Sequence, residues 1–268
     1  MTLTIRPAIA DDYKAFARLF PELATNDPIL ERAQFVADLL PTTLVAQIGD
    51  AIAGYAYFRT MKDVAYIRHI VTAPEARRQG IGRKLMEAIS DRARTEGAKE
   101  WCLNVKPDNA AAIALYTKMG LVRAFESRAL RIAWSDIENL PSGDHHVAVR
   151  SIAEVEDETI ERALGLIAGE FASARKMDGR VVLALEDDAK AIVGAAVFHP
   201  QFPGAYPFRV VHSEFAMPFL RAISRYARRG DEFVNVMIER HMDVADALVA
   251  AGAIVRLNVV HMKGPLPS

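Results

Sequence analysis

RRQGIGRKL, residues Arg77–Leu85, is the stretch that decides the fold, because two glycines join a predicted strand to a predicted helix there. It follows YIRHIVTAPEA, which is rich in β-branched residues, and it leads into an amphipathic run that stops at Gly97. A helix N-terminus offers unpaired N–H groups and a partial positive charge, and glycines let the backbone approach an oxyanion. The stretch therefore predicts a strand–loop–helix unit whose loop binds an anion.

The two commoner phosphate loops do not fit this stretch. A Walker loop needs the pattern G-x-x-x-x-G-K-[ST], and neither its glycine spacing nor its Lys-Ser/Thr pair is present. A dinucleotide fingerprint needs G-x-G-x-x-G, and Leu85 stands where the third glycine should be. A plain surface turn before a basic helix stays open as the alternative at this point.

Composition limits the class of protein. The 268 residues are 51% hydrophobic and 25% charged with a net charge of −1, which predicts a globular protein without a global field for nucleic acid or anionic membranes. Cys102, the single cysteine, excludes an internal disulfide and favours a reducing compartment. We see no leader peptide, no membrane span and no metal-binding motif. We therefore expect a cytoplasmic protein without a metal ion.

Strands and helices are predicted on both sides of the glycine loop. Alternation, helical spacing and turn residues give the order β α α β β β α β α β β over about 135 residues. The last two strands are expected within residues 121–134. The other strands are expected at residues 3–8, 43–50, 52–60, 64–72 and 101–105, and the helices after Asp11, at 29–40, after the loop and after Asn109.

The pattern then restarts after a polar segment. VAVRSIAEVEDETIERALGLI, from Val147, is similar to LTIRPAIADDYKAFARLF, from Leu3, and Gly194 stands in the place of Gly54. Self-similarity at a spacing of about 140 residues predicts duplication of a whole domain. We expect domains at 1–136 and 147–268, joined by a linker at 137–146.

Two motifs of the first half resemble the GNAT superfamily of acyl-CoA-dependent acyltransferases. The pattern Q/R-x-x-G-x-G/A is filled by Arg77, Gly80 and Gly82. The pattern N-x-x-A-x-x-x-Y-x-x-x-G-F/L is filled further on by Asn109, Ala112, Tyr116, Gly120 and Leu121. The resemblance covers about residues 3–134. It implies an α/β (α+β) fold in which each domain has a mixed, mainly antiparallel sheet flanked by helices.

The resemblance also implies a site for acetyl-CoA. The loop amides would hold the pyrophosphate, and the preceding strand would pair with the pantetheine arm as an added strand. Asn109 would contact that arm or act only as an ordinary N-cap. The implied cofactor-binding residues are Ile70, Val71, Thr72, Arg77, Arg78, Gln79, Gly80, Ile81, Gly82, Arg83 and Asn109.

Two residues are candidates for catalysis by the same resemblance. The Tyr116 hydroxyl could protonate the leaving thiolate, and its alternative role is that of a core tyrosine. His69 has a suitable ordinary pKa for a general base, although a strand histidine is more often structural, and a water relay to a carboxylate would also serve. Cys102 lies in an apolar strand and is expected in the core.

The second half departs from both motifs. SEFAMPFLRAI, residues Ser213–Ile223, stands opposite the glycine loop without glycines, while Leu248 replaces Tyr116 and His241 replaces Asn109. We therefore expect a degenerate copy that does not bind the cofactor. Residues 198–208, rich in aromatics and proline, are expected to form a long loop.

The resemblance implies an N-acetyltransferase. It would move an acetyl group from acetyl-CoA to a primary amine of a small molecule or peptide, by direct attack in a ternary complex. The alternative is a non-catalytic acetyl-CoA-binding sensor or interaction module. We expect a monomer or homodimer without nucleic-acid or membrane partners, and the acceptor is not legible in the sequence.

Overall fold

The chain repeats one order of elements twice. The computed structural model describes residues 2–25, 27–143 and 146–267. From β1 to β6 the main elements recur in the same order from β7 to β12, which confirms the predicted duplication. The chain forms two compact units: unit 1 is Met1–Ala124 with His261–Ser268, and unit 2 is Phe125–Val260.

Unit 1 is built on a mixed, mainly antiparallel sheet with the order β1-β2-β3-β4-β5, followed by the end of β12. The first three pairings are antiparallel and β4 with β5 is parallel. The antiparallel register between β1 and β2 runs without a shift from Leu3 opposite Ile48 to Pro7 opposite Leu44. The strands are β1 Leu3–Pro7, β2 Thr43–Ile48, β3 Ala51–Met61, β4 Val64–Thr72 and β5 Glu100–Val105.

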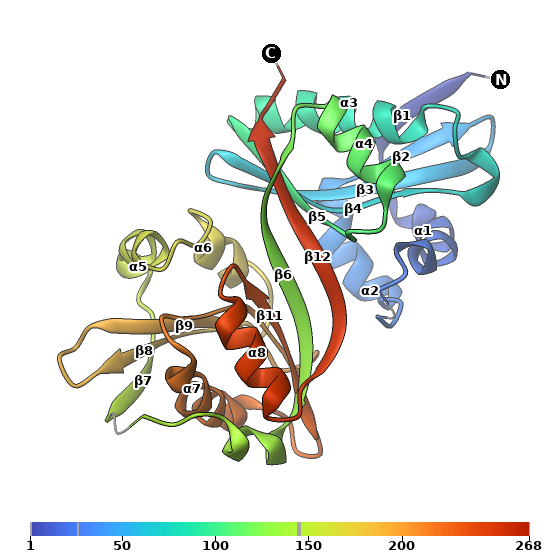
Figure 1. Cartoon of the computed structure of the whole chain (residues 1–268). Coiled ribbons are helices and arrows are strands. Elements are labelled where there is room, and N and C mark those ends of the chain that lie inside the picture. Colours follow the sequence, from blue (N-terminus) through green and yellow to red (C-terminus); the bar gives the residue numbers. More distant parts are fainter. Residues whose placement is uncertain (1, 26, 144–145, 268) are drawn as a thin grey trace. The chain divides into compact units, whose positions relative to one another are not determined.

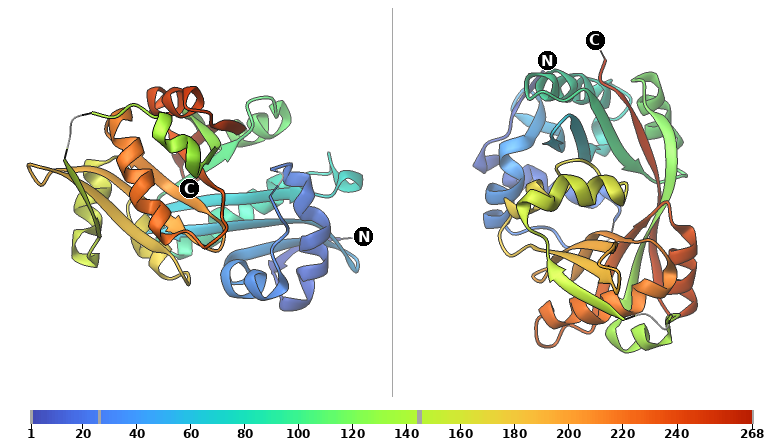
Figure 2. Two further views of the ribbon diagram at one scale, coloured as in Figure 1. Left: turned by 90° about the horizontal axis from the view of Figure 1, so that it is seen from below. Right: turned by 90° about the vertical axis from the view of Figure 1, so that its left-hand side faces the viewer.

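Helices cover both faces of the unit 1 sheet. Figures 1 and 2 show α1 and α2 on one face and α3 on the other. The long helix α3 buries one apolar stripe against the sheet, including Leu85 and Ile89, and Gly97 with a φ of 90° follows its end. The helices are α1 Tyr13–Leu19, α2 Arg32–Gln34 continued by η3 Phe35–Leu39, α3 Ile81–Thr95 and α4 Ala110–Lys118.

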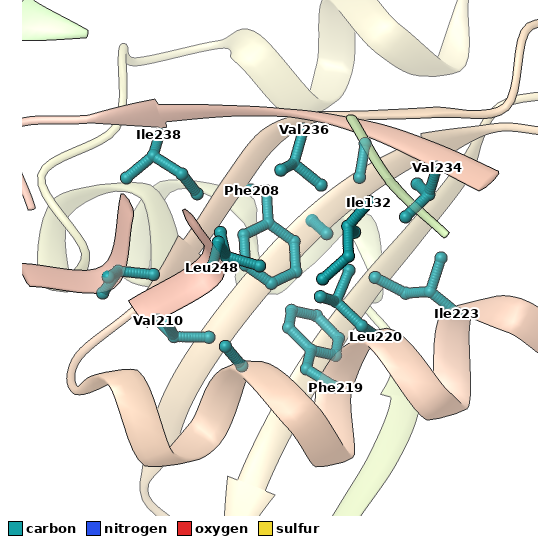
Figure 3. Close-up of a cluster of buried hydrophobic side chains, with 14 of the residues drawn as sticks. Ile132, Phe208, Val210, Phe219, Leu220, Ile223, Val234, Val236, Ile238 and Leu248 are labelled. Carbon is teal, nitrogen blue, oxygen red and sulfur yellow. The ribbon is translucent and has the colours of Figure 1, made fainter. Parts of the chain in front are cut away.

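Unit 2 has its own sheet and core. Its strands follow the order β7-β8-β9-β10-β11, and residues 125–133 of β6 then pair antiparallel with β11. Figure 3 shows its apolar core, in which the Phe208 and Phe219 rings stack at 5.5 Å. The elements are β7 Val147–Ser151, α5 Asp157–Ala163, α6 Glu170–Arg175, β8 Val181–Asp187, β9 Ile192–His199, β10 Gly204–Val210, α7 Ala216–Ile223, β11 Phe233–Glu239, α8 Met242–Ala250 and β12 Ile254–Pro265.

The two strands predicted within residues 121–134 are wrong, because a single strand, β6 Val122–Ala133, spans that segment. The segment has no Gly, Pro or Asn at which a hairpin could turn, so its backbone stays extended. The place that a further strand would take in the unit 1 sheet, beside β5, is filled by the end of β12 (Figure 1). The two repeats thus exchange their last strands.

The long loop predicted at residues 198–208 is also wrong. β9 and β10 form a hairpin there, in which Gly204 pairs with His199 and a bulge sets off Tyr206 and Pro207. Aromatic residues favour strands, and the bulge accommodates the proline, which cannot donate a ladder hydrogen bond.

The predicted linker does not run free along its length. It overlaps η6 Trp134–Asn139, and Ile137 and Leu140 are buried in the unit 2 core. Asp144 and His145 of this segment lie outside the described residues. The predicted domains at 1–136 and 147–268 follow the sequence repeat, whereas the compact units exchange strands, and those boundaries stay a prediction.

Candidate functional site

The glycine loop joins the end of β4 to the start of α3, as predicted. After Thr72 the chain makes one short 3-10 turn, Pro74–Ala76, and it reaches the N-cap of α3 at Gly80. The first backbone hydrogen bond that returns to the loop runs from the Lys84 N–H to the Gly80 carbonyl at 3.0 Å. The amides ahead of Lys84 have no partner within the helix and point along the start of its axis.

The two loop glycines are needed for different reasons. Gly80 has a φ of +78° and open space around the position of a Cβ, so its requirement is conformational. A Cβ on Gly82 would lie 3.2 Å from Leu115 Cδ2 and 4.0 Å from Thr72 Oγ1, so its requirement is close packing. Gly82 therefore brings the end of β4, the loop and α4 together.

Cationic side chains surround this loop at the surface. Arg77 pairs with Glu22 at 2.6 Å, and Arg83 with Glu87 at 2.8 Å. Hydrogen bonds from Lys84 and Arg83 lower the pKa of Glu87. Exposed pairs of this kind contribute little and exchange partners readily, so these arginines remain able to turn toward an anion.

The edge of β4 opens directly before the loop. Parallel pairing of β4 with β5 ends where Ile67 pairs with Leu103. At the same level the β3–β4 register shifts, so Arg68 is an extra residue between Ile67 and His69. Beyond this bulge the predicted residues Ile70, Val71 and Thr72 pair with β3 on one side, and β5 has separated from them on the other.

His69 lies in an aromatic setting on this separated part of β4. Its Nδ1 is 3.5 Å from the Tyr55 hydroxyl, and its ring packs edge-on against Phe20 and Tyr57. Burial, with the nearby positive charges of Arg68 and Arg59, lowers the pKa of His69 to about 3. The imidazole is therefore neutral at pH 7 and only weakly basic.

Asn109 and Tyr116 lie on α4. Asn109 is the N-cap, and its Oδ1 accepts a hydrogen bond from the Ala112 N–H at 3.1 Å. Tyr116 is 5% exposed, and burial raises the pKa of its hydroxyl, so the group keeps its proton at pH 7. A protonated hydroxyl can act as a donor.

Within residues 2–25, 27–143 and 146–267 no group of three or more His, Cys, Asp or Glu side chains could hold a metal ion. None of the helices in these ranges combines the length and apolarity needed to cross a membrane. Cys102 is buried, as expected for a core residue.

The loop, the open strand edge and α4 all lie within the segment that matches a known family. The sequence model described as the acetyltransferase (GNAT) family matches residues 8–121. Residues 8–121 belong to the GNAT family. The match includes both motifs in full, from Arg77 to Leu121, and it stops before the second repeat begins.

Curated relatives are similar to a shorter part of the chain. The [ribosomal protein bS18]-alanine N-acetyltransferase of Salmonella typhimurium is 37% identical over 75 residues, which are 28% of this chain and 51% of that protein. The enzyme of the same name from Escherichia coli K12 is 37% identical over 73 residues, 27% of this chain and 49% of its own. The chain thus spans about half the length of the curated relatives it matches.

Solved structures match the whole chain in fold. A putative acetyltransferase from Pyrococcus horikoshii has a TM-score of 0.72 at 15% identity, over 98% of this chain and 89% of that one. A GCN5-related N-acetyltransferase from Sphaerobacter thermophilus gives 0.68 at 17%, over 99% and 96%. A tandem GNAT protein from the clavulanic acid biosynthesis pathway gives 0.61 at 18%, over 100% and 99%. Both repeats therefore have the GNAT fold.

One polar cluster of unit 1, called the GNAT unit from here on, was not predicted from the sequence. Asn104, the first β5 residue beyond the parallel pairing, donates from Nδ2 to the Tyr66 hydroxyl at 2.8 Å. Its Oδ1 lies 2.9 Å from Nδ1 of His261, near the end of the chain. No local signal could have joined residues 157 positions apart, because only the strand exchange brings them together.

Proposed function

We propose that the GNAT unit is an N-acyltransferase that transfers an acetyl group from acetyl-CoA to a primary amine. The observation that carries this proposal is the direct passage from the open edge of β4 into a helix N-terminus with exposed amides. An extended chain of amides fits the first feature, and a pyrophosphate fits the second. Family membership of residues 8–121 supports the same assignment.

The proposed cofactor site divides into two parts. Ile70, Val71 and Thr72 would offer backbone groups to the pantetheine arm, and the side-chain amide of Asn109 would face the same arm. The loop would hold the pyrophosphate through its amides, since the place that a Cβ on Gly80 would take has no neighbouring atom within 4 Å. The loop residues are Arg77, Arg78, Gln79, Gly80, Ile81, Gly82 and Arg83.

The reaction needs two proton movements: the attacking nitrogen loses a proton, and the leaving sulfur gains one. The amine nitrogen forms a bond to the thioester carbonyl carbon, the carbon–sulfur bond breaks, and the thiolate takes a proton. Tyr116 would supply that proton, because its buried hydroxyl carries one at pH 7.

His69 would act on the amine in a limited way. A pKa of about 3 makes it a poor base for an ammonium ion, whose own pKa lies several units higher. We propose instead that its ring accepts a hydrogen bond from an amine that enters neutral, and that the displaced proton leaves to water. This assignment predicts a rate that rises with pH until the acceptor amine is deprotonated.

The acceptor class is an amine of a peptide or small molecule. The curated relatives are named for acetylation of an alanine in a ribosomal protein, which favours a peptide N-terminus among the acceptors to test. The second candidate function, a non-catalytic acetyl-CoA sensor, is favoured by the weak basicity of His69 alone.

Calorimetry with acetyl-CoA and thiol release over an amine panel test the proposal together. The panel should contain peptides with N-terminal alanine, free amino acids and polyamines. We expect one acetyl-CoA per chain, because the second repeat lacks the glycine loop, and amine-dependent release of CoA. Binding without release would support the sensor, and no binding would exclude both functions.

A further inference from the structure

The end of the chain is part of the GNAT unit. Residues from His261 onward belong to unit 1, and the end of β12 lies beside β5 in its sheet (Figure 1). The Leu266 N–H donates to the Lys99 carbonyl at 2.8 Å, and Arg94 donates to the Pro267 carbonyl. The last strand of the second repeat is therefore built into the sheet that carries the candidate site of the first.

This strand also touches the helix that bears Tyr116. A Cβ on Gly264 would lie 2.3 Å from the carbonyl oxygen of Gly120, the residue just after α4. Only a glycine permits this approach, because the obstacle is backbone and cannot move aside. The exchanged strand thus fixes the end of α4 by contact.

A buried chain of hydrogen bonds extends from the same strand into the site. His261 is 4% exposed and Tyr66 is 3% exposed, and their rings meet edge-on at 6.0 Å. The Asn104 carbonyl oxygen can only accept, so Nδ1 of His261 donates to it. The Asn104 amide then donates to the Tyr66 oxygen, which sets the orientation of that hydroxyl.

The hydroxyl so oriented lies where β4 and β5 part. Tyr66 pairs with Cys102 in the parallel ladder, and the ladder ends at the next residue, Ile67. Tyr66 also pairs with Arg59 across the sheet, so both side chains lie on one face. Arg59 donates to the Tyr57 hydroxyl, and the Tyr57 ring contacts His69, so the cluster and the candidate catalytic histidine share that face.

We propose that His261 is a positioning residue of the acetyltransferase site, which acts through Asn104 to hold the Tyr66 hydroxyl where the strands separate. The inference rests on the proposed function, because an arm paired with Ile70–Thr72 would bring its acyl end to this point. Tyr66 would then contact the acyl group or the incoming amine. The second repeat, although it lost its own glycine loop, would supply a residue that the first repeat needs.

Two variants of His261 separate orientation from packing. His261→Asn keeps a donor near the place of Nδ1 and removes the ring, whereas His261→Phe keeps the ring contact with Tyr66 and removes the donor. Tyr66→Phe removes the hydroxyl at the other end. His146→Asn, at an exposed position outside this cluster, is the matched control. For each variant we would measure kcat, KM for the amine, acetyl-CoA affinity and thermal midpoint.

The proposal expects His261→Phe and Tyr66→Phe to lower kcat/KM for the amine by about ten-fold or more, with acetyl-CoA affinity within about two-fold. His261→Asn should recover most of the loss. Unchanged kinetics in His261→Phe would overturn the inference while leaving the proposed function standing. Equal losses in both His261 variants, with Tyr66→Phe like wild type, would also overturn it, since ring packing would then be the role. A wild-type protein that acetylates no amine would overturn the proposed function, and the inference with it.

Discussion

The segment that joins β4 to α3 and the segment that joins β10 to α7 hold the same place in the two repeats and are built differently. The first takes eight residues, Ala73 to Gly80, and ends at a glycine with positive φ. The second takes five, Val211 to Phe215, with no residue at positive φ, and it leads into a helix of 8 residues where α3 has 15. A short loop without glycine cannot present its amides to a pyrophosphate in the same way.

The framework around the two segments is nevertheless conserved between the repeats. Arg6 forms two hydrogen bonds to Asp12, which also accepts from the amide of Ile9. In the second repeat Arg150 likewise forms two hydrogen bonds to Glu156, which also accepts one from the amide of Ala153. The strand separation also recurs, because β10 pairs with β11 over only two residues. The fold thus keeps its shape without the residues proposed to bind the cofactor.

The helices α4 and α8, which follow the separated strands, also keep the same fold but differ in proposed functional residues. Tyr116 is the seventh residue of α4, and Leu248 is the seventh residue of α8, whose N-cap is His241. Leu248 is fully buried and points into the apolar core beside Phe208 (Figure 3). The same helix position thus carries an apolar side chain in the second repeat and a hydroxyl group in the first. Tyr116 is therefore the first residue to substitute.

Tyr116→Phe should have the largest effect. Removal of a general acid lowers turnover by about 100-fold or more, while the loop and strand that hold the cofactor are untouched. Steady-state kcat with the best amine from the panel and acetyl-CoA affinity by calorimetry measure the two quantities. Leu248→Met, a swap of similar volume in unit 2, is the control and should leave kcat unchanged. Wild-type turnover in Tyr116→Phe would exclude the proposed acid.

Gly54→Ala should destabilise the protein more than Gly194→Ala. These glycines occupy equivalent places, opposite Thr72 in β4 and Val210 in β10. A Cβ on Gly54 would lie 2.6 Å from the Val71 carbonyl oxygen, against 3.0 Å from the Arg209 oxygen for Gly194. We expect a loss of about 1–3 kcal/mol for Gly54→Ala and a smaller loss for Gly194→Ala, measured by urea unfolding. A larger loss of stability in Gly194→Ala would mean that β10 moves aside less easily than β4 to make room for the added methyl group.

Gly80→Ala should act on affinity rather than on packing. The φ of +78° costs a residue with a Cβ about 1 kcal/mol, and the surrounding space is open, so the loop can relax. We expect acetyl-CoA to bind about five- to ten-fold more weakly, because relaxation turns the amides away from the ligand. Calorimetry measures the loss, and Gly230→Ala, also at positive φ but in unit 2, is the control. Equal affinity in both variants would remove the loop from the proposed site.

Local patterns were sufficient for the loop, α3 and the cap of α4. Each depends on residues a few positions apart, as when Asn109 bonds the amide of Ala112. The duplication could also be predicted, because the segments from Leu3 and Val147 are similar and Gly194 stands in the place of Gly54. What could be predicted was therefore what depends on residues close in the sequence, or on the repetition of a pattern.

The strand exchange could not be predicted, since alternation shows that a segment is a strand and not which sheet it joins. The end of β12 has the same pattern whether it completes its own repeat or the other one. For this reason His261 gave no signal beside Asn104 and Tyr66. The weak basicity of His69 could not be predicted either, because it comes from burial among the rings of Tyr57 in β3 and Phe20, which are far from it in the sequence or on another element.

The substitutions Asp12→Asn and Glu156→Gln should show the smallest difference in stability effect between the two repeats. Burial alone would raise the pKa of Asp12, but hydrogen bonds from Arg6 and the Ile9 amide, with the Arg6 charge, lower it overall. Because the folded-state pKa is depressed, the stabilisation is present above the unfolded pKa of about 4 and is lost as pH falls through the folded pKa. Arg6 is 30% exposed, so solvent screening limits the loss in Asp12→Asn to about 0.5–1 kcal/mol at pH 6.

Urea unfolding of both variants at pH 6 and pH 3 measures this difference. The gap between wild type and Asp12→Asn should narrow at pH 3, where the wild-type carboxyl begins to protonate. Glu156→Gln should follow the same pH course with a smaller amplitude, because the Glu156 side chain is 33% exposed and that of Asp12 is 9% exposed. An equal amplitude in the two variants would mean that the pair is conserved between the repeats for chain geometry, through its bond to the backbone amide, rather than for charge.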